Sequence, residues 1–202
     1  LLETLNDARR YLKKNGVLIP CGLKQYVAPV LSQRLQSEID IWPQVGFGVN
    51  LDAARTMSLN NMYVRAVQPA DVGGSETQAK CWDTLRFAAD TDAAPSLRRE
   101  SVHWSGKSLG NVTVHGYALW WVVELVPDVT ISTSPFAEAT HWEQIYLPLL
   151  SPITLDAADT LECTLTSDTR PDVGVRVAWR TRHLRAGKAL ATQDQDITKG
   201  RI

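Results

Sequence analysis

One run of residues, Tyr117–Leu165, decides the fold: YALWWVVELVPDVTISTSPFAEATHWEQIYLPLLSPITLDAADTLECTL. Apolar residues alternate in it with a period of two, as expected for strands that bury one face. The alternating sets are Tyr117, Leu119, Trp121, Val123 and Leu125; Ile145, Leu147 and Leu149; and Leu161, Cys163 and Leu165. Several such strands separated by turns predict a mainly β protein, an antiparallel β-barrel or sandwich.

The alternation continues on both sides of this run. Downstream, Val173, Val175, Val177 and Trp179 alternate with polar residues. After Arg185 the periodicity is lost, which predicts a flexible tail over 186–202. Upstream, a strand is expected from Val17, with Pro20 placing it at a sheet edge or bulge. The barrel is therefore expected to comprise residues 17–31 and 62–185.

Two segments have helical rather than strand spacing. Apolar residues from Leu1 to Leu12 recur every three or four positions and Gly16 follows, so 1–16 is expected to form a connecting helix. Within 32–61, Leu35, Ile39 and Trp42 also show helical spacing, which predicts a helical arm inserted between strands. Such an arm cannot bury its own apolar surface. Its aromatic residues Trp42 and Phe47 are expected to pack on the domain body or on another chain.

Composition narrows the classes of partner. The 202 residues include 21 Lys and Arg against 22 Asp and Glu, a net charge of −1, which argues against nucleic acid or an anionic membrane as a partner. Three cysteines exclude a disulfide framework and favour a reducing, cytoplasmic location. No apolar run reaches the roughly 18 residues of a membrane helix. Because the first residue is Leu1 and it starts inside a helical pattern, we expect the chain to be part of a longer protein.

Few motifs carry chemistry. Ser105-Gly106-Lys107-Ser108 ends like a phosphate-binding loop, but Ser101 stands where that motif needs glycine. No cofactor-binding residues are therefore expected. The four histidines lack metal-ligand spacing, so no metal site is expected either. His141 differs from the others because it lies in a polar loop between strands. From the residues alone it is either a structural loop residue or a general acid or base.

The central strands and the loop between them are similar to a known family. The run His115–Leu165 resembles the C-terminal β-barrel of protein arginine methyltransferases. The similarity is carried by Ser132-Thr133-Ser134-Pro135, by Thr140-His141-Trp142 and by Asp159-Thr160-Leu161. The first twenty residues resemble the helix that follows the family's paired-glutamate loop. The segment 32–61 lies where the family inserts its dimerisation arm.

The resemblance implies roles for particular residues. In the family, the matching histidine pairs with an aspartate from the cofactor domain and helps to shape the substrate-arginine site. His141 would take that catalytic role, Thr140 and Trp142 would line the substrate channel, and Trp42 and Phe47 would contact a second protomer. The implied partners are an N-terminal Rossmann-like domain, a second copy of the chain and a protein arginine substrate.

The family's S-adenosylmethionine site and its two guanidinium-binding glutamates have no match in this sequence. Methyl transfer needs carboxylates that hold the guanidinium in line with the methyl donor. This chain alone is therefore expected to be inactive, with S-adenosylmethionine bound by the parent protein. Two alternatives remain: a non-catalytic barrel that serves binding or oligomerisation, and an unrelated β-sandwich for a small ligand. In the last case His141 would be buried and hydrogen-bonded.

Overall fold

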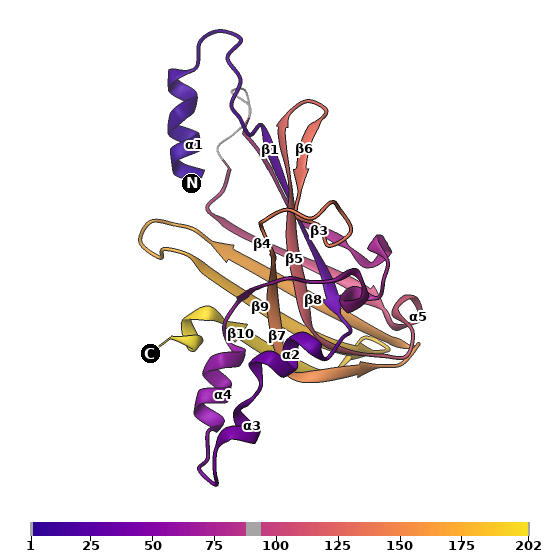
Figure 1. Cartoon of the computed structure of the whole chain (residues 1–202). Coiled ribbons are helices and arrows are strands. Elements are labelled where there is room, and N and C mark those ends of the chain that lie inside the picture. Colours follow the sequence, from indigo (N-terminus) through magenta and orange to yellow (C-terminus); the bar gives the residue numbers. More distant parts are fainter. Residues whose placement is uncertain (1, 88–93, 202) are drawn as a thin grey trace.

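The fold is known from a computed structural model, which describes residues 2–87 and 94–201. Strands in these residues form two antiparallel sheets (Figure 1). The larger sheet has the order β2 (Tyr63–Arg65), β7 (Gln144–Leu155), β5 (Val112–Val126), β1 (Gly22–Val30) and β3 (Lys80–Arg86), with β6 (Val129–Ser132) paired to the end of β5. The smaller sheet has the order β10 (Lys188–Asp196), β9 (Arg176–Arg185), β8 (Asp159–Asp168) and β4 (Leu97–Ser105). The predicted mainly β, antiparallel fold is confirmed.

The main core lies between the two sheets. The inward residues of β7 and β8, among them Leu149 and Leu165, are fully buried there. Trp104 stacks on Tyr117 with ring centroids 5.8 Å apart. The indole N–H of Trp179 donates to the carbonyl oxygen of Pro148 at 3.1 Å, so this polar atom is satisfied inside the core. This core is the one that the period-two alternation predicts.

Strand β5 is buried on both of its faces between Val114 and Trp120. Tyr117 points into the core between the sheets, whereas Ala118 and Trp120 belong to a second core on the outer face of the larger sheet. Gly116 permits the close approach of β7, because a Cβ there would lie 2.4 Å from the carbonyl oxygen of Leu147. The alternating pattern does not predict this second core.

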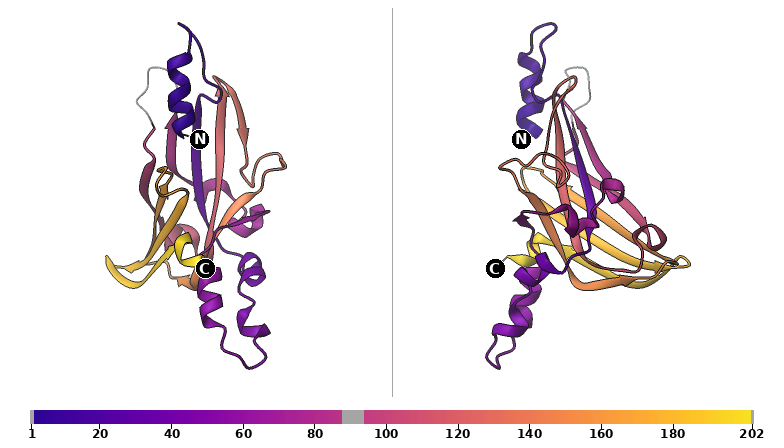
Figure 2. Two further views of the ribbon diagram at one scale, coloured as in Figure 1. Left: turned by 90° about the vertical axis from the view of Figure 1, so that its left-hand side faces the viewer. Right: turned by 45° about the vertical axis from the view of Figure 1, so that its right-hand side comes forward.

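The second core is covered by the inserted helical segment. Three helices occupy the range expected for the arm: α2 (Arg34–Ile39), α3 (Trp42–Val45) and α4 (Asp52–Leu59). Leu35, Ile39 and Leu59 pack on Trp120 and its neighbours. Beyond this root, α3 and α4 project from the sheets as a hairpin (Figure 2). Short one-turn helices complete the described elements: η1 (Arg9–Tyr11), η2 (Pro69–Val72), η3 (Glu76–Gln78), α5 (Gly106–Leu109) and η4 (Ile197–Gly200).

The N-terminal helix lies at the opposite end of the molecule from the arm (Figure 2). Helix α1 (Leu2–Ala8) buries Leu2 in a small cluster with Leu85 and Phe87. Leu1, part of the predicted helix, lies outside the described residues. The strand expected from Val17 begins only at Gly22, and the side chains of Val17 and Ile19 are 60% and 64% exposed. The prediction is wrong there because no strand in the described ranges pairs with residues 17–20; the backbone pairing begins at Cys21, which bonds to Glu124 and Phe87.

The prediction of a flexible tail after Arg185 also differs from the structure. Residues 188–196 form β10, which pairs with β9 along its length. This strand has few buried side chains, so it lacks the alternation that would have revealed it. It is ordered by pairing and by polar contacts instead. Gln195 donates to the carbonyl oxygen of Pro148 at 2.9 Å, and Ile197 is buried in the main core.

None of the helices in the described ranges is both long and apolar enough to cross a membrane.

The main core gives a stability prediction. Leu149→Ala removes a fully buried side chain and should lower the free energy of unfolding by about 2–5 kcal/mol, the usual cost of a buried Leu-to-Ala cavity. Leu190→Ala is the matched control, because that side chain is 55% exposed and its loss should change stability by about 0.5 kcal/mol or less. Urea unfolding of both variants measures the difference. Equal losses would contradict the assignment of the core.

Candidate functional site

The loop between β6 and β7 carries the three residues singled out by the resemblance. The hydroxyl of Thr140 closes a tight turn around His141. It accepts from the Trp142 backbone N–H at 3.2 Å and donates to the Trp142 carbonyl oxygen at 3.1 Å. Thr140 is thereby a turn-forming residue. The turn presents His141 and Trp142 at the molecular surface.

His141 is exposed, and within the described ranges its imidazole makes no hydrogen bond or ion pair. Its ring lies against Trp142, with ring centroids 4.0 Å apart. Trp142 in turn meets Trp121 of β5 edge to face, at 5.7 Å and 60°. The imidazole is therefore held by aromatic contacts while both of its nitrogens remain open for a further partner.

A cavity of about 390 Å³ opens beside this loop. Its lining includes Leu119 and Ile145 from the end of the main core, the indoles of Trp121 and Trp142, the imidazole of His141 and the side chain of Glu143. Aromatic faces together with a carboxylate suit a cationic, partly apolar group such as a guanidinium on its alkyl stem.

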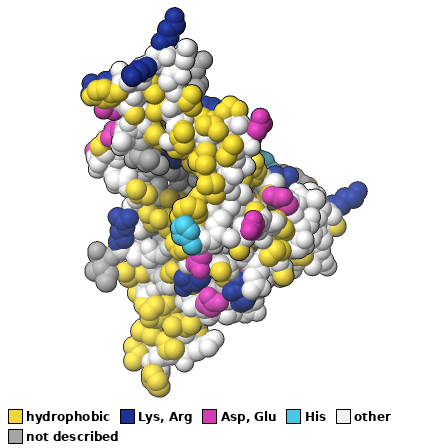
Figure 3. All heavy atoms as spheres, turned by 45° about the horizontal axis from the view of Figure 1, so that its top comes forward, with side chains coloured by type: hydrophobic (Ala, Val, Ile, Leu, Met, Phe, Trp, Pro, Cys, Tyr) yellow, Lys and Arg dark blue, Asp and Glu magenta, His cyan; other side chains and the backbone are white. Residues whose placement is uncertain are grey.

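The two aromatic residues predicted to mediate contacts lie together at the tip of the arm, on a separate part of the molecule. Trp42 and Phe47 both line a cavity of about 560 Å³ between α3 and α4. Phe47 is fully exposed, and the buried indole Nε1 of Trp42 has no hydrogen-bond partner in the part of the chain that the structure describes. Hydrophobic side chains gather over this tip (Figure 3), including the exposed Ile41, Val45 and Val49. An apolar surface of this kind is typical of an interface.

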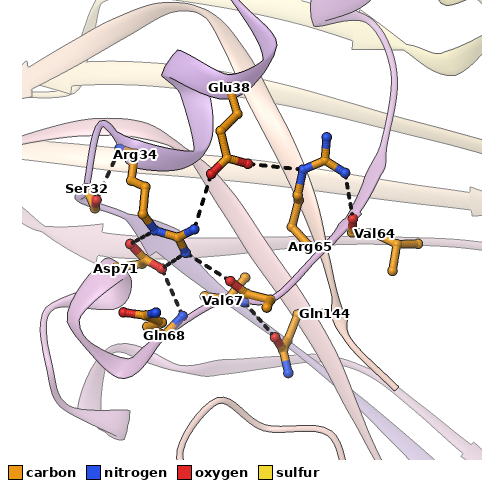
Figure 4. Close-up of polar contacts among 10 residues, drawn as sticks. Ser32, Arg34, Glu38, Val64, Arg65, Val67, Gln68, Asp71 and Gln144 are labelled. Atoms are coloured by element: carbon orange, nitrogen blue, oxygen red, sulfur yellow. Dashed lines mark hydrogen bonds and ion pairs between the residues drawn. The ribbon is translucent and has the colours of Figure 1, made fainter. Parts of the chain in front are cut away.

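Arg34 and Asp71 anchor the root of the arm, a contact that our reasoning from the sequence missed (Figure 4). The Arg34 guanidinium donates to the buried carboxylate of Asp71 at 2.5 and 3.3 Å and to the carbonyl oxygen of Ala66 at 2.9 Å. Burial alone would raise the pKa of Asp71. The hydrogen bonds from Arg34 and from the backbone N–H of Gln68 outweigh it and hold that pKa below its usual value. No local motif in the sequence indicates this pair.

A histidine also lies under the arm. The His115 Nδ1 is 2.8 Å from the side-chain oxygen of Gln36 in α2, and both residues are buried. Burial lowers the pKa of His115 because the charged imidazolium would lose its hydration there. His115 lies in β5, in the part of that strand that is buried on both faces.

The remaining histidines lie in strands as well, His103 in β4 and His183 in β9. The His183 Nε2 is 2.8 Å from the buried carboxylate of Asp159, which also accepts from Arg185 at 2.6 Å. Hydrogen bonds from Arg185, from the Asp156 backbone and from His183 hold the pKa of Asp159 well below its usual range. This cluster joins β8 to β9.

The turn formed by Ser105, Gly106, Lys107 and Ser108 is not a phosphate-binding loop in the structure. Gly106 starts the one-turn helix α5, and a Cβ there would lie 1.9 Å from the carbonyl oxygen of Asp156, so it packs on its neighbour instead of facing a ligand. Gly46 and Gly48 lie at the exposed end of the arm. Among residues 2–87 and 94–201, no group of three metal-ligating side chains comes together.

Two antiparallel sheets, a helical arm inserted after the first strand and an exposed histidine loop define a class of oligomerising barrel domains. Comparison with known proteins identifies the family. A family model described as the arginine methyltransferase oligomerization subdomain matches residues 24–182. The chain belongs to the arginine methyltransferase family and forms the C-terminal barrel domain of such a protein.

Individual relatives agree. Protein arginine N-methyltransferase 6 of Xenopus laevis is 29% identical over 192 residues, which cover 88% of this chain and 51% of that protein. The histone-arginine methyltransferase CARMER of Drosophila persimilis is 28% identical over 171 residues, or 80% of this chain and 32% of that protein. The chain thus spans about half the length of the Xenopus relative.

Solved structures share the fold. A Trypanosoma brucei PRMT1 enzyme–prozyme heterotetrameric complex with AdoHcy superimposes with a TM-score of 0.75 at 18% identity, over 96% of this chain and 62% of that one. Arabidopsis thaliana protein arginine methyltransferase 10 gives 0.66 at 15% identity, over 97% and 65%. Family membership excludes the alternative of an unrelated small-ligand sandwich.

The His115 environment gives a pH prediction. Because its pKa is lower in the folded state, the unfolded chain takes up a proton first as pH falls below about 6.5, and stability should decrease from there. His115→Gln keeps a donor for Gln36 but cannot titrate. The fall in Tm between pH 7.5 and pH 5 should therefore be smaller in this variant than in the wild type. His103→Gln, at an exposed position, is the control and should keep the full fall.

Proposed function

We propose that this chain is the barrel part of an S-adenosylmethionine-dependent protein arginine methyltransferase, in which His141 and Trp142 wall the channel for the substrate arginine. The observation that carries the proposal is the exposed imidazole of His141. It has no polar partner in the described chain and stands beside an aromatic cavity. A carboxylate from a cofactor domain would pair with it, as the resemblance implies.

The channel chemistry supports a guanidinium substrate. Trp142 is 46% exposed, and its indole meets that of Trp121 edge to face, with the ring planes inclined at 60°. Indole faces attract a cation, while the alkyl stem of an arginine gains from burial against them. An imidazole that lies against a neighbouring indole, as His141 does against Trp142, can orient an acidic group from another domain. These residues would bind and orient the substrate arginine. Carboxylates from outside this chain would hold its guanidinium.

The cofactor would also be bound outside this chain. In the turn that directly follows β4, Gly106 packs on the carbonyl oxygen of Asp156, so this turn does not suit the ribose and sulfonium of S-adenosylmethionine. S-adenosylmethionine, when bound by a partner domain, would supply the methyl group. This chain by itself would then have no methyltransferase activity.

The arm would join two protomers. Phe47 is fully exposed at its tip, and Trp42 beside it leaves a buried indole N–H without a partner in the described residues. A second protomer that covers this tip would bury the exposed phenyl ring and could accept from that N–H.

His141→Ala tests the catalytic half of the proposal in the longer protein that contains this chain. It should lower kcat/KM for an arginine peptide by about a hundredfold, the usual scale for loss of a positioned histidine. His103→Ala is the control, because His103 is also an exposed histidine but lies on β4, away from the loop. Methyl transfer is followed with labelled S-adenosylmethionine. If the unaltered longer protein transfers no methyl group, the non-catalytic oligomerisation module is the correct reading.

Phe47→Ser tests the arm. Removing the exposed ring should weaken self-association by tenfold or more, while the folded barrel stays intact because the ring touches none of its core. Tyr11→Ser removes another aromatic ring, 71% exposed, from the opposite end of the molecule and should leave association unchanged. Sedimentation velocity over a concentration series measures both. An unchanged dissociation constant for Phe47→Ser would contradict the role of the arm.

A further inference from the structure

Gln144 stands where the histidine loop ends and β7 begins, and its side chain is almost fully buried. The carboxamide makes two hydrogen bonds to backbone groups from different segments. Its nitrogen donates to the carbonyl oxygen of Thr133 at 2.8 Å, and its oxygen accepts from the N–H of Val67 at 2.8 Å. Thr133 is the first residue after β6, so this one side chain joins both ends of the loop that carries His141 and Trp142.

The second bond extends the connection to the arm. Val67 lies on the chain that returns from the arm, one residue after Ala66, whose carbonyl oxygen accepts from Arg34. Arg34 is in turn held by Asp71. Figure 4 shows the contacts of Arg34 with Asp71 and with the peptide group between residues 66 and 67, whose N–H, that of Val67, donates to Gln144. The root of the arm and the base of the histidine loop thus share one polar network.

The loop has further contacts to η3 and β5: the hydroxyl of Ser134 donates to the Glu76 carboxylate at 3.5 Å, and the Trp142 indole meets that of Trp121. At its start, the Thr133 N–H donates to the Trp121 carbonyl oxygen at 3.0 Å. At its tip, Thr140 bonds only to the backbone of Trp142. The Gln144 carboxamide uses both its oxygen and its nitrogen in these contacts. Loss of either contact would leave a buried backbone group without a hydrogen-bond partner, which lowers the free energy of unfolding.

We infer that Gln144 is a positioning residue, whose carboxamide holds the Thr133–Glu143 loop, and with it His141 and Trp142, against the chain returning from the arm. The inference rests on the proposed function for the importance of that loop. Gln144 lies outside the Thr140–Trp142 triplet, but its contacts determine the position of that triplet.

The test reads loop position by NMR in this chain and needs no catalysis. Gln144→Met keeps an unbranched side chain of similar length but removes both hydrogen bonds. Its matched control is Gln193→Met, because Gln193 also bridges a backbone N–H and a carbonyl oxygen, those of Ser151, at 3.1 and 2.8 Å. The chemical shifts of the His141 ring and the Trp142 indole measure the position of the loop. Hydrogen exchange of the Val67 amide measures whether its hydrogen bond to Gln144 is intact.

In Gln144→Met, the Val67 amide should exchange about fivefold faster or more, and the His141 and Trp142 signals should shift. Gln193→Met should leave all three unchanged. If Gln144→Met does not fold, Gln144→Asn serves instead, because an amide one methylene shorter cannot reach both groups and should shift the same signals. His141 and Trp142 signals that stay in place in a folded variant overturn the inference. That outcome would not count against methyl transfer. Conversely, a longer protein without activity would refute the proposed function but not the positioning role of Gln144.

Discussion

The structure depends on the burial of strand β5 from both sides. Between Val114 and Trp120 this strand has the four-stranded sheet on one face and the root of the helical arm on the other. A strand in that position needs side chains at successive residues that are apolar or, like His115, hydrogen-bonded inside the protein, and it needs Gly116 where the β7 backbone comes close. The arm therefore contributes to the fold through α2, in addition to projecting from it.

The same arrangement places the histidine loop. Strand β7 pairs with β5 on one side and with the short β2 on the other, and β2 is the strand by which the chain returns from the arm. The loop that precedes β7 thus lies next to the arm root by topology. The polar contacts of Arg34, Asp71 and Gln144 use that neighbourhood. The arm, proposed for association, and the histidine loop, proposed for substrate binding, are thereby joined by hydrogen bonds through the peptide group between residues 66 and 67.

Reasoning from the sequence succeeded where a residue's environment depends on its own neighbours along the chain. The alternation in β7 and β8 and the helical spacing of 32–61 correspond to elements of the structure. The approach failed for β10, whose order comes from pairing with β9 and not from buried side chains. It also failed for residues 17–20, which pair with no strand of the described chain.

The sequence by itself determined the fold class, the family resemblance and the Thr140-His141-Trp142 loop, because these depend on local periodicity and on a contiguous motif. Only the tertiary structure decided which backbone groups the buried polar side chains reach. Gln144 finds Val67 across 77 positions, and Gln36 finds His115 across 79. A glutamine in a sequence does not indicate which groups its carboxamide will bond to. Its partners are set by which segments the sheets and the arm bring together, and that is a property of packing.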